Sequence, residues 1–270
     1  MQVIIKKIAW LMQKTMQTSA SESLNAAGNI FIGQTEAPLM IRPMIKDMTK
    51  SELHAVMTGG FATIAGSVLG AYIFFGISAS HLLSASVMSA PAALAIAKLF
   101  YPETEESKHV DIDNIDLPKG SFVPTFSFRF LSSWVLSQED CRLVAELIGI
   151  KTFLNEFVAY ERLAGFIGNR QMVLDNTCRS SGGSRILHEV RSEIIATYAL
   201  CGFSNVGSIG IQLGGLTPMA PSRAGDLASV ALRALIAGSI ACFTTACIAG
   251  LLYDEANYDA SVVSINSTST

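Results

Sequence analysis

The sequence predicts an all-α integral membrane protein, built from inverted repeats of a re-entrant hairpin plus a broken transmembrane helix. Of its 270 residues, 50% are hydrophobic and only 15% are charged, and the mean hydropathy is +0.41. A soluble domain carries charge on about a quarter of its residues. Residues 54–77 and 81–97 contain no Lys, Arg, Asp or Glu, and residues 230–253 contain only Arg233. About 20 mainly apolar residues cross the hydrocarbon layer, so these runs predict membrane spans.

The first repeat begins with an amphipathic helix and a hairpin. Residues 1–18 place apolar and weakly polar side chains at helical spacing, with lysines elsewhere on the helix. The recurring positions are Ile4, Ile8, Leu11, Met12 and Thr15. Residues 19–47 are interrupted by two glycines and two prolines, which predicts a helix, a turn near Gly33 and a returning helix. Backbone can turn at membrane depth only where protein or a water-filled cavity satisfies its polar groups.

The spans that follow are interrupted to different degrees. Residues 51–77 predict a spanning helix broken by glycines near Thr63, and residues 80–100 predict another that Pro91 kinks or starts. Residues 102–119 are polar and acidic and predict a solvent loop. Residues 121–136 are aromatic but short and carry an arginine, so they predict only a weak span.

The second half repeats this order of parts. Residues 139–160 predict a second hairpin, and residues 161–193 a polar loop. Residues 194–216 predict a span interrupted by glycines, and residues 227–253 the last span. A polar tail occupies residues 254–270. Matching interrupted segments in two halves of a membrane protein indicate a transporter with its substrate site at the repeat interface.

Two carboxylates are candidate functional groups because each lies in a hairpin among apolar segments. Glu36 ends the polar triplet that follows Gly33, and Glu156 lies in the second hairpin. An ionised side chain is costly in such surroundings, so these glutamates are candidates for substrate contact.

Other function classes find no support in the residue pattern. No Ser/His/Asp, Cys/His or phosphate-loop constellation is present, which argues against an enzyme, and no organic cofactor is expected. The five cysteines have no metal-ligand spacing and no CxxC pair. A net charge of −3 gives no reason to expect nucleic acid as a partner.

Five motifs closely resemble those of the concentrative nucleoside transporters, above all the animal members. In order, the motifs lie at residues 28–39 (GNIFIGQTEAPL), 57–72 (MTGGFATIAGSVLGAY), 84–94 (SASVMSAPAAL), 155–160 (NEFVAY) and 198–210 (YALCGFSNVGSIG). The resemblance covers about residues 1–107 and 138–253. It implies a sodium-coupled nucleoside symporter (proton-coupled in some members) with an elevator-type transport domain. It also implies a homotrimer in a lipid bilayer, with the plasma membrane as the expected location.

The resemblance also implies a division of the chain. Residues 1–50 would hold the amphipathic helix and first hairpin, at the end of the family's gate region. Residues 51–253 would form the transporter's C-terminal region with the second hairpin, followed by the tail at 254–270.

Site residues are implied wherever the sequence matches the family motifs. The residues implied to contact or line the nucleobase are Gln34, Thr35, Glu36 and Val68. The residues implied on the ribose side are Glu156, Phe203, Asn205 and Ser208. The residues implied to bind sodium, the coupling ion, are Asn29, Ile32, Thr63 and Ile64. Ribose hydroxyls suit a carboxylate acceptor and an amide that both donates and accepts, and sodium suits oxygen ligands.

Structural interpretations compete with these roles. The Gln-Thr-Glu triplet is also typical of a helix cap with a surface turn. In this interpretation Glu156 would be a buried structural acid paired with an arginine such as Arg162, and Asn205 and Ser208 would pack a helix interface.

A second function hypothesis is a truncated product. The family's early spans, and one expected between Lys119 and Gln138, have no clear counterpart here. Such a product would not transport; it would interact with full-length subunits or be degraded. Because an elevator moves against a fixed frame, we expect no uptake from the chain by itself if that frame is missing.

Overall fold

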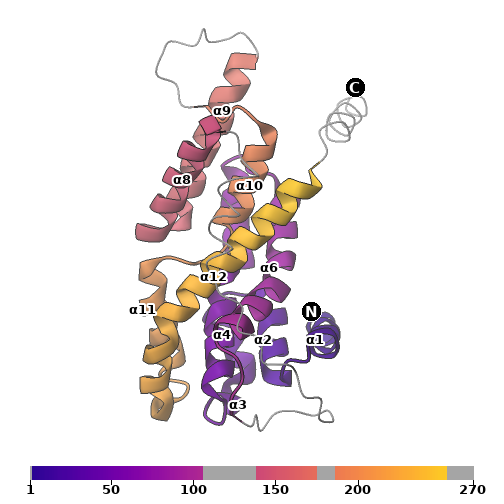
Figure 1. Cartoon of the computed structure of the whole chain (residues 1–270), viewed down its shortest axis with the longest axis vertical. Helices are drawn as coiled ribbons and strands as arrows, with labels where there is room; N and C mark the ends of the chain where they lie inside the picture. The colour runs from indigo at the N-terminus through magenta and orange to yellow at the C-terminus, as the bar shows by residue number, and fades with distance from the viewer. Residues whose placement is uncertain (1, 106–137, 175–185, 254–270) are drawn as a thin grey trace.

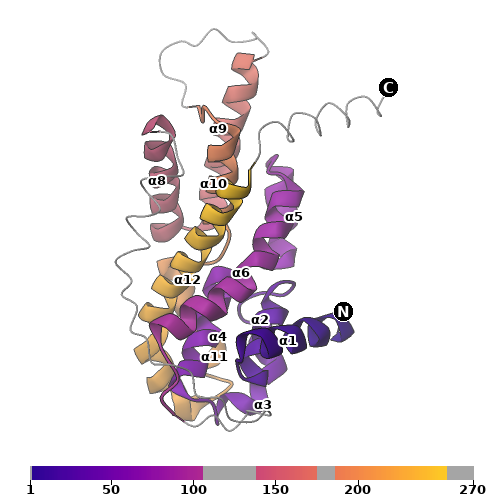
Figure 2. The ribbon, with the colours of Figure 1, turned by 45° about the vertical axis from the view of Figure 1, so that its right-hand side comes forward.

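The computed structural model describes residues 2–105, 138–174 and 186–253, and within these ranges it contains helices and no strand. The prediction of an all-α fold is confirmed. In Figures 1 and 2 the long helix α12 (Ala224–Leu252) runs obliquely between two groups of helices. One group holds α1 to α4, and the other holds α8 to α10.

The N-terminal helix α1 (Gln2–Met16) packs against α2 (Ala20–Asn29). Its buried side chains are Ile5, Ala9 and Met12, whereas Ile4 and Leu11 are more than half exposed. The amphipathic helix was predicted correctly, but its buried side lies one residue further along the chain than the predicted apolar side. Both sets of residues satisfy the helical period, so only the contact with α2 decides which side is buried.

The first hairpin has one regular limb and one irregular limb. Its parts are α2, a turn at residues 30–36, the 3-10 helix η1 (Ala37–Ile41) and α3 (Arg42–Ile45). The predicted turn near Gly33 is confirmed, but the returning limb is two short helices. Pro38 and Pro43 each lie in the first turn of one of them, where the missing N–H of proline costs no hydrogen bond.

The break predicted in the following helix is present. α4 (Lys50–Ala62) ends at Ala62, and α5 (Gly66–Phe74) begins after three non-helical residues, 63–65. The next helix, α6 (Ala79–Phe100), contains Pro91 in its interior rather than at its start. Within the described residues, three helical segments are long and apolar enough to cross a membrane: Lys50–Phe74, Ala79–Phe100 and Pro221–Leu252.

The second repeat has a longer hairpin than predicted. Its elements are α8 (Gln138–Phe153), α9 (Glu156–Leu174), α10 (Val190–Leu200), α11 (Val206–Leu216) and the 3-10 helix η2 (Pro221–Arg223) before α12. The prediction of a polar loop from residue 161 is wrong, because α9 continues to Leu174. Leu163, Phe166 and Ile167 are buried at helical spacing, and the charged Glu161 and Arg162 that suggested a loop lie on the exposed side. Arg170 is mostly buried and pairs with Glu193 on α10.

Each broken helix ends against the hairpin of the other repeat. The Tyr72 ring on α5 lies 4.3 Å from the ring of Tyr160, and the ring of Phe75, directly after α5, lies 5.0 Å from that of Phe157. Tyr160 and Phe157 are both on α9. In the reverse direction, α11 reaches the tip of the first hairpin through Gln212. This exchange agrees with inverted repeats, and it gathers the apolar core around α12 and the two breaks.

Several predicted segments lie outside the described residues. They are most of the acidic loop (106–119), the weak span (121–136), part of the polar segment after α9 (175–185) and the tail (254–270).

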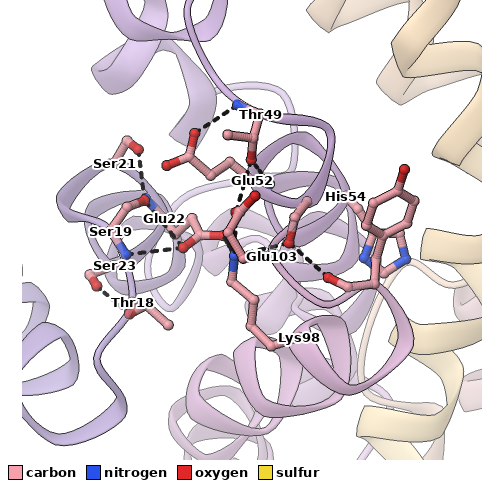
Figure 3. A network of polar contacts seen from close by, with 12 residues as sticks. Thr18, Ser19, Ser21, Glu22, Ser23, Thr49, Glu52, His54, Lys98 and Glu103 are labelled. Carbon is pink, nitrogen blue, oxygen red and sulfur yellow. Dashed lines mark hydrogen bonds and ion pairs between the residues drawn. The ribbon is translucent and has the colours of Figure 1, made fainter. Parts of the chain in front are cut away.

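A buried polar network joins the first hairpin to α4 and α6 (Figure 3). α2 and α4 each begin with a capping box, in which Glu22 and Glu52 accept from the backbone N–H groups of Ser19 and Thr49. Lys98 near the end of α6 lies 2.6 Å from the carboxylate of Glu22. The two capped helix starts and the end of α6 are thereby held together, away from the hairpin tip.

Replacing Lys98 by Met should destabilise the fold. Glu22 is 1% exposed and would lose its ammonium partner, whereas Lys98 itself is a quarter exposed. Breaking a buried ion pair costs about 3–5 kcal/mol, so partial exposure places the expected loss near 3 kcal/mol, or roughly 5–10 °C in Tm. Thermal unfolding of the purified chain in detergent measures it. The control Lys50→Met removes an exposed pair with Asp226 and should change Tm little. Equal Tm values for the two variants would contradict the role of Lys98.

Candidate functional site

The two helix breaks meet at the centre of the fold. The backbone N–H of Phe203 donates to the carbonyl oxygen of Thr63 at 3.2 Å, which links the second break to the first. Gly202 has a φ of +116°, and a Cβ there would lie 2.7 Å from the carbonyl oxygen of Phe61. Only glycine allows this backbone conformation at such a close approach.

Helix α12 lies behind both breaks. A Cβ at Gly238 would come within 2.6 Å of the Phe61 side chain, so α12 packs closely on the end of α4. One turn later, the thiol of Cys242 donates to the carbonyl oxygen of Cys201, the first residue after α10. The breaks therefore have a fixed backing on this side.

Glu156, Asn205 and Ser208 form one cluster where the second hairpin meets the second break. Asn205 caps α11: its Oδ1 accepts from the backbone N–H of Ser208 at 2.8 Å, and its Nδ2 donates to Oε2 of Glu156 at 2.9 Å. Glu156 is the first residue of α9 and is 7% exposed. The cap explains why asparagine suits this helix start.

The alternative pairing of Glu156 with Arg162 is wrong. The guanidinium of Arg162 lies 3.3 Å from Oε1 of Glu146, on the exposed side of the hairpin. Within the described residues, the hydrogen-bond partner of the Glu156 carboxylate is the amide of Asn205. A carboxylate that accepts one bond from a neutral amide keeps further lone pairs for another donor.

The tip of the first hairpin contacts the other end of α11. Gln34 is buried, and its Oε1 accepts from Nε2 of Gln212 at 3.2 Å. The half-buried Thr35 lies against Gly215, where a Cβ would be 2.9 Å from the threonine methyl group. Glu36 is exposed, and its carboxylate folds over Gly33.

Gln212 was not among the residues singled out from the sequence. It lies four residues after Ser208 and shares its buried side of α11, and its Nε2 also donates to the carbonyl oxygen of Met57 at 3.0 Å. The sequence did offer a signal for Gln212, because it is a polar residue one helical turn after the candidate Ser208 in a mainly apolar segment.

The two residues predicted to make apolar contacts, Val68 and Phe203, lie at the edge of one hydrophobic core cluster. Val68 in the first turn of α5 and Phe203 in the second break are both half-buried and pack against buried residues that include Ile64 and Tyr72. Each therefore retains exposed apolar surface next to a helix break.

The four predicted sodium ligands lie at the first hairpin tip and the first break. Asn29 is fully buried, and neither polar atom of its amide has a hydrogen-bond partner among the described residues. The hydroxyl of Thr63 donates to the carbonyl oxygen of Gly59, Ile64 is buried in the break, and Ile32 is half-buried in the tip. A Cβ at Gly66 would lie 2.8 Å from the carbonyl oxygen of Phe31, so tip and break touch.

The structure thus joins the predicted residues into groups connected by α11 and by the breaks. Glu156, Asn205 and Ser208 are in direct contact, and Gln34 reaches the same helix. No described contact joins Glu36 to Glu156. That the two hairpin tips close around one ligand stays a prediction.

Two family models match most of the chain. Residues 1–79 match the model described as nucleoside recognition, the gate model. Residues 81–127 and 122–250 match the model described as Na+ dependent nucleoside transporter C-terminus.

Curated proteins from animals are similar to the chain over nearly its whole length. Solute carrier family 28 member 3 of Eptatretus stoutii is 50% identical over 94% of this chain and 45% of its own length. Sodium/nucleoside cotransporter 1 of Mus musculus is 46% identical over 94% of this chain and 47% of its own length. The chain spans about half the length of the curated relatives it matches.

Solved structures agree with the fold. CNTnw in an inward-facing substrate-bound state is 33% identical, with a TM-score of 0.76 over 93% of this chain and 69% of that one. A doubly substituted variant of CNTnw in an outward-facing state is 32% identical, with a TM-score of 0.73 over 93% of this chain and 70% of that one. These relatives are transporters, in agreement with the expectation that the chain is not an enzyme. The chain belongs to the sodium-dependent, concentrative nucleoside transporter family.

Proposed function

We propose that this chain forms the nucleoside- and sodium-binding part of a sodium-coupled nucleoside symporter. The observation that carries the proposal is the buried Glu156–Asn205 pair where the second hairpin meets the second break. The helix that starts at this pair also contacts the first hairpin tip through Gln212. A ligand next to α11 would touch both repeats, as expected for a substrate site at a repeat interface.

The ribose is assigned to the second hairpin and second break. Glu156 accepts from ribose hydroxyls with carboxylate lone pairs that Asn205 leaves free, and Ser208 adds a hydroxyl that donates or accepts. Phe203 supplies an apolar surface beside the sugar. The buried position of Glu156 supports this role, because charge-assisted hydrogen bonds are about twice as strong as neutral ones.

The nucleobase is assigned to the first hairpin tip. Gln34, Thr35 and Glu36 together provide donors and acceptors for base edges, and Val68 provides an apolar contact. Gln34 is already oriented by Gln212. This bond favours a defined direction for its amide, which recognition of a base edge needs.

Sodium is assigned to Asn29, Ile32, Thr63 and Ile64. The donor set suits a hard cation, since it consists of an amide oxygen, a hydroxyl and the backbone carbonyls of a turn and of an unwound helix. The unpaired, fully buried amide of Asn29 supports the assignment, because buried polar groups are rarely left without a partner. A bound sodium ion would join the hairpin tip to the break.

The larger setting is proposed by analogy with the family. We infer an elevator-type movement of this region in the plasma membrane, within a homotrimer whose other parts provide the fixed frame. The breaks, backed by α12, suit a unit that moves as a rigid body, because their contacts are made within the unit.

Binding of tritiated uridine to the purified chain in lipid nanodiscs tests the proposal. We expect saturable binding that increases with sodium, does not increase with choline, and is displaced by unlabelled uridine. Sodium-independent or unsaturable binding would argue against a coupled nucleoside site.

Replacing Asn29 by Leu should remove the response to sodium without loss of stability. The amide has no hydrogen-bond partner to lose in the part of the chain that the structure describes, so a similar-sized apolar residue should leave Tm in choline unchanged or higher. The sodium-induced rise in Tm should disappear, because stabilisation by a ligand requires its site. Thermal unfolding across a sodium titration measures both effects.

Asn25 provides the control, one turn earlier on the same helix. Its Nδ2 donates to the carbonyl oxygen of Val56 at 3.4 Å, so Asn25→Leu should lower Tm while the sodium response remains. A full sodium response in Asn29→Leu would remove Asn29 from the ion site.

A further inference from the structure

Lys151 is a buried cation that the proposed function does not use. It lies in the last turn of α8, just before the second hairpin tip, and is 2% exposed. Its ammonium donates to the carbonyl oxygen of Ala199 at 3.0 Å and to that of Cys201 at 3.4 Å. Among the described residues no salt bridge joins Lys151 to an acid.

The partners of this ammonium are the last carbonyls before the second break. Ala199 lies in the final turn of α10, and Cys201 follows its last residue. Carbonyls at a helix C-terminus lack intrahelical donors and carry the negative end of the helix dipole, so they attract a cation. Burying a lysine without an acid is costly, which makes its presence there informative.

In the first repeat, the position that corresponds to Lys151 holds a group able to bind a cation, the amide of Asn29. In both repeats the first helix of the hairpin packs on the first half of the broken helix: α2 on α4, and α8 on α10. The end of α2 presents to this junction the amide of Asn29, whose polar atoms have no hydrogen-bond partner among the residues that the structure describes. The end of α8 presents the ammonium of Lys151. One junction thus holds a group suited to a mobile cation, and the other holds a cation attached to the chain.

We propose that Lys151 is a built-in cation that replaces a bound ion at the second break. Its ammonium fixes the end of α8 to the end of α10 permanently. Glu156 follows Lys151 by five residues, and Asn205 follows Cys201 by four. The bond from Lys151 to the Cys201 carbonyl oxygen therefore also positions Glu156 relative to Asn205. Lys151 is therefore a positioning residue for the ribose side, and this last step rests on the proposed function.

Chemical rescue tests the positive charge separately from packing. Lys151→Ala removes three side-chain carbons and the ammonium group. Added n-propylammonium has the same three carbons and the positive charge, whereas 1-propanol has a similar shape without the charge. We expect Tm to fall by roughly 5–10 °C and to recover when the variant is purified in propylammonium, but not in propanol. Lys151→Met, which keeps the volume without the charge, should be as unstable as Lys151→Ala, and Lys151→Arg should be close to wild type.

Tritiated uridine binding gives the second readout. Lys151→Met should raise the Kd of uridine about tenfold, and propylammonium should restore the affinity of Lys151→Ala. Recovery by propanol equal to that by propylammonium, or a Lys151→Met variant as stable as wild type, would overturn the proposal. The Tm measurements need no nucleoside, so they still decide the role of Lys151 if the wild-type chain binds no uridine and the proposed function fails.

Discussion

Uridine should bind the Glu156→Gln variant about ten- to a hundredfold more weakly than the wild-type chain. Glutamine keeps one oxygen for the amide of Asn205, so the hydrogen bond between the second hairpin and α11 survives. What is lost is the charged acceptor for the ribose hydroxyls, worth roughly 1.5–3 kcal/mol. Scintillation proximity binding in sodium measures the Kd, and Tm without ligand should stay near the wild-type value.

The matched control is Glu161→Gln, the same substitution on the same helix at an exposed position. It should bind uridine like the wild-type chain. Asn205→Ala should weaken binding less than Glu156→Gln, but it should lower Tm because it also removes the cap of α11. Unchanged affinity in Glu156→Gln would reject the assigned role of this carboxylate.

Gly202→Ala should destabilise the chain by about 2–5 kcal/mol, or prevent it from folding. A non-glycine residue at a φ of +116° is strained, and its Cβ would lie within 2.8 Å of the carbonyl oxygens of Phe61 and Ala62. The atoms in the way are backbone, so they cannot move aside as a flexible side chain would. Thermal unfolding and size-exclusion chromatography in detergent measure the outcome.

Gly210→Ala is the control for this prediction. Gly210 lies within α11, and nothing is found within 4 Å of the place where its Cβ would be. Alanine stabilises a helix interior by about 1 kcal/mol relative to glycine, so this variant should melt at the same temperature or higher. A Gly202→Ala variant as stable as Gly210→Ala would show that the two breaks do not pack as closely as the structure indicates.

Elements defined by local sequence were predicted well. The charge-poor runs predicted the three helical segments of the described residues that can cross a membrane, and the glycines predicted the hairpin turn near Gly33 and both helix breaks. These features depend on the cost of burying charge and on backbone freedom, which are properties of a residue and its near neighbours. α9 was the exception beyond Tyr160. There the exposed charged residues of an amphipathic helix looked like a loop, because only a packing partner shows which side is buried.

The candidate site was predicted as a set of residues but not as a set of contacts. Glu156, Asn205, Ser208 and Gln34 were expected from motifs that the sequence contains, and the family follows from those motifs alone. The bond between Gln212 and Gln34 joins residues 178 positions apart, and the bond of Lys151 to the end of α10 spans about 50. No local period or spacing carries such pairings. They arise only from tertiary packing: the first bond forms where the two repeats pack across each other, and the second where α8 packs on α10 within the second repeat. This packing decides which buried polar groups have partners and which, like the amide of Asn29, have none among the described residues.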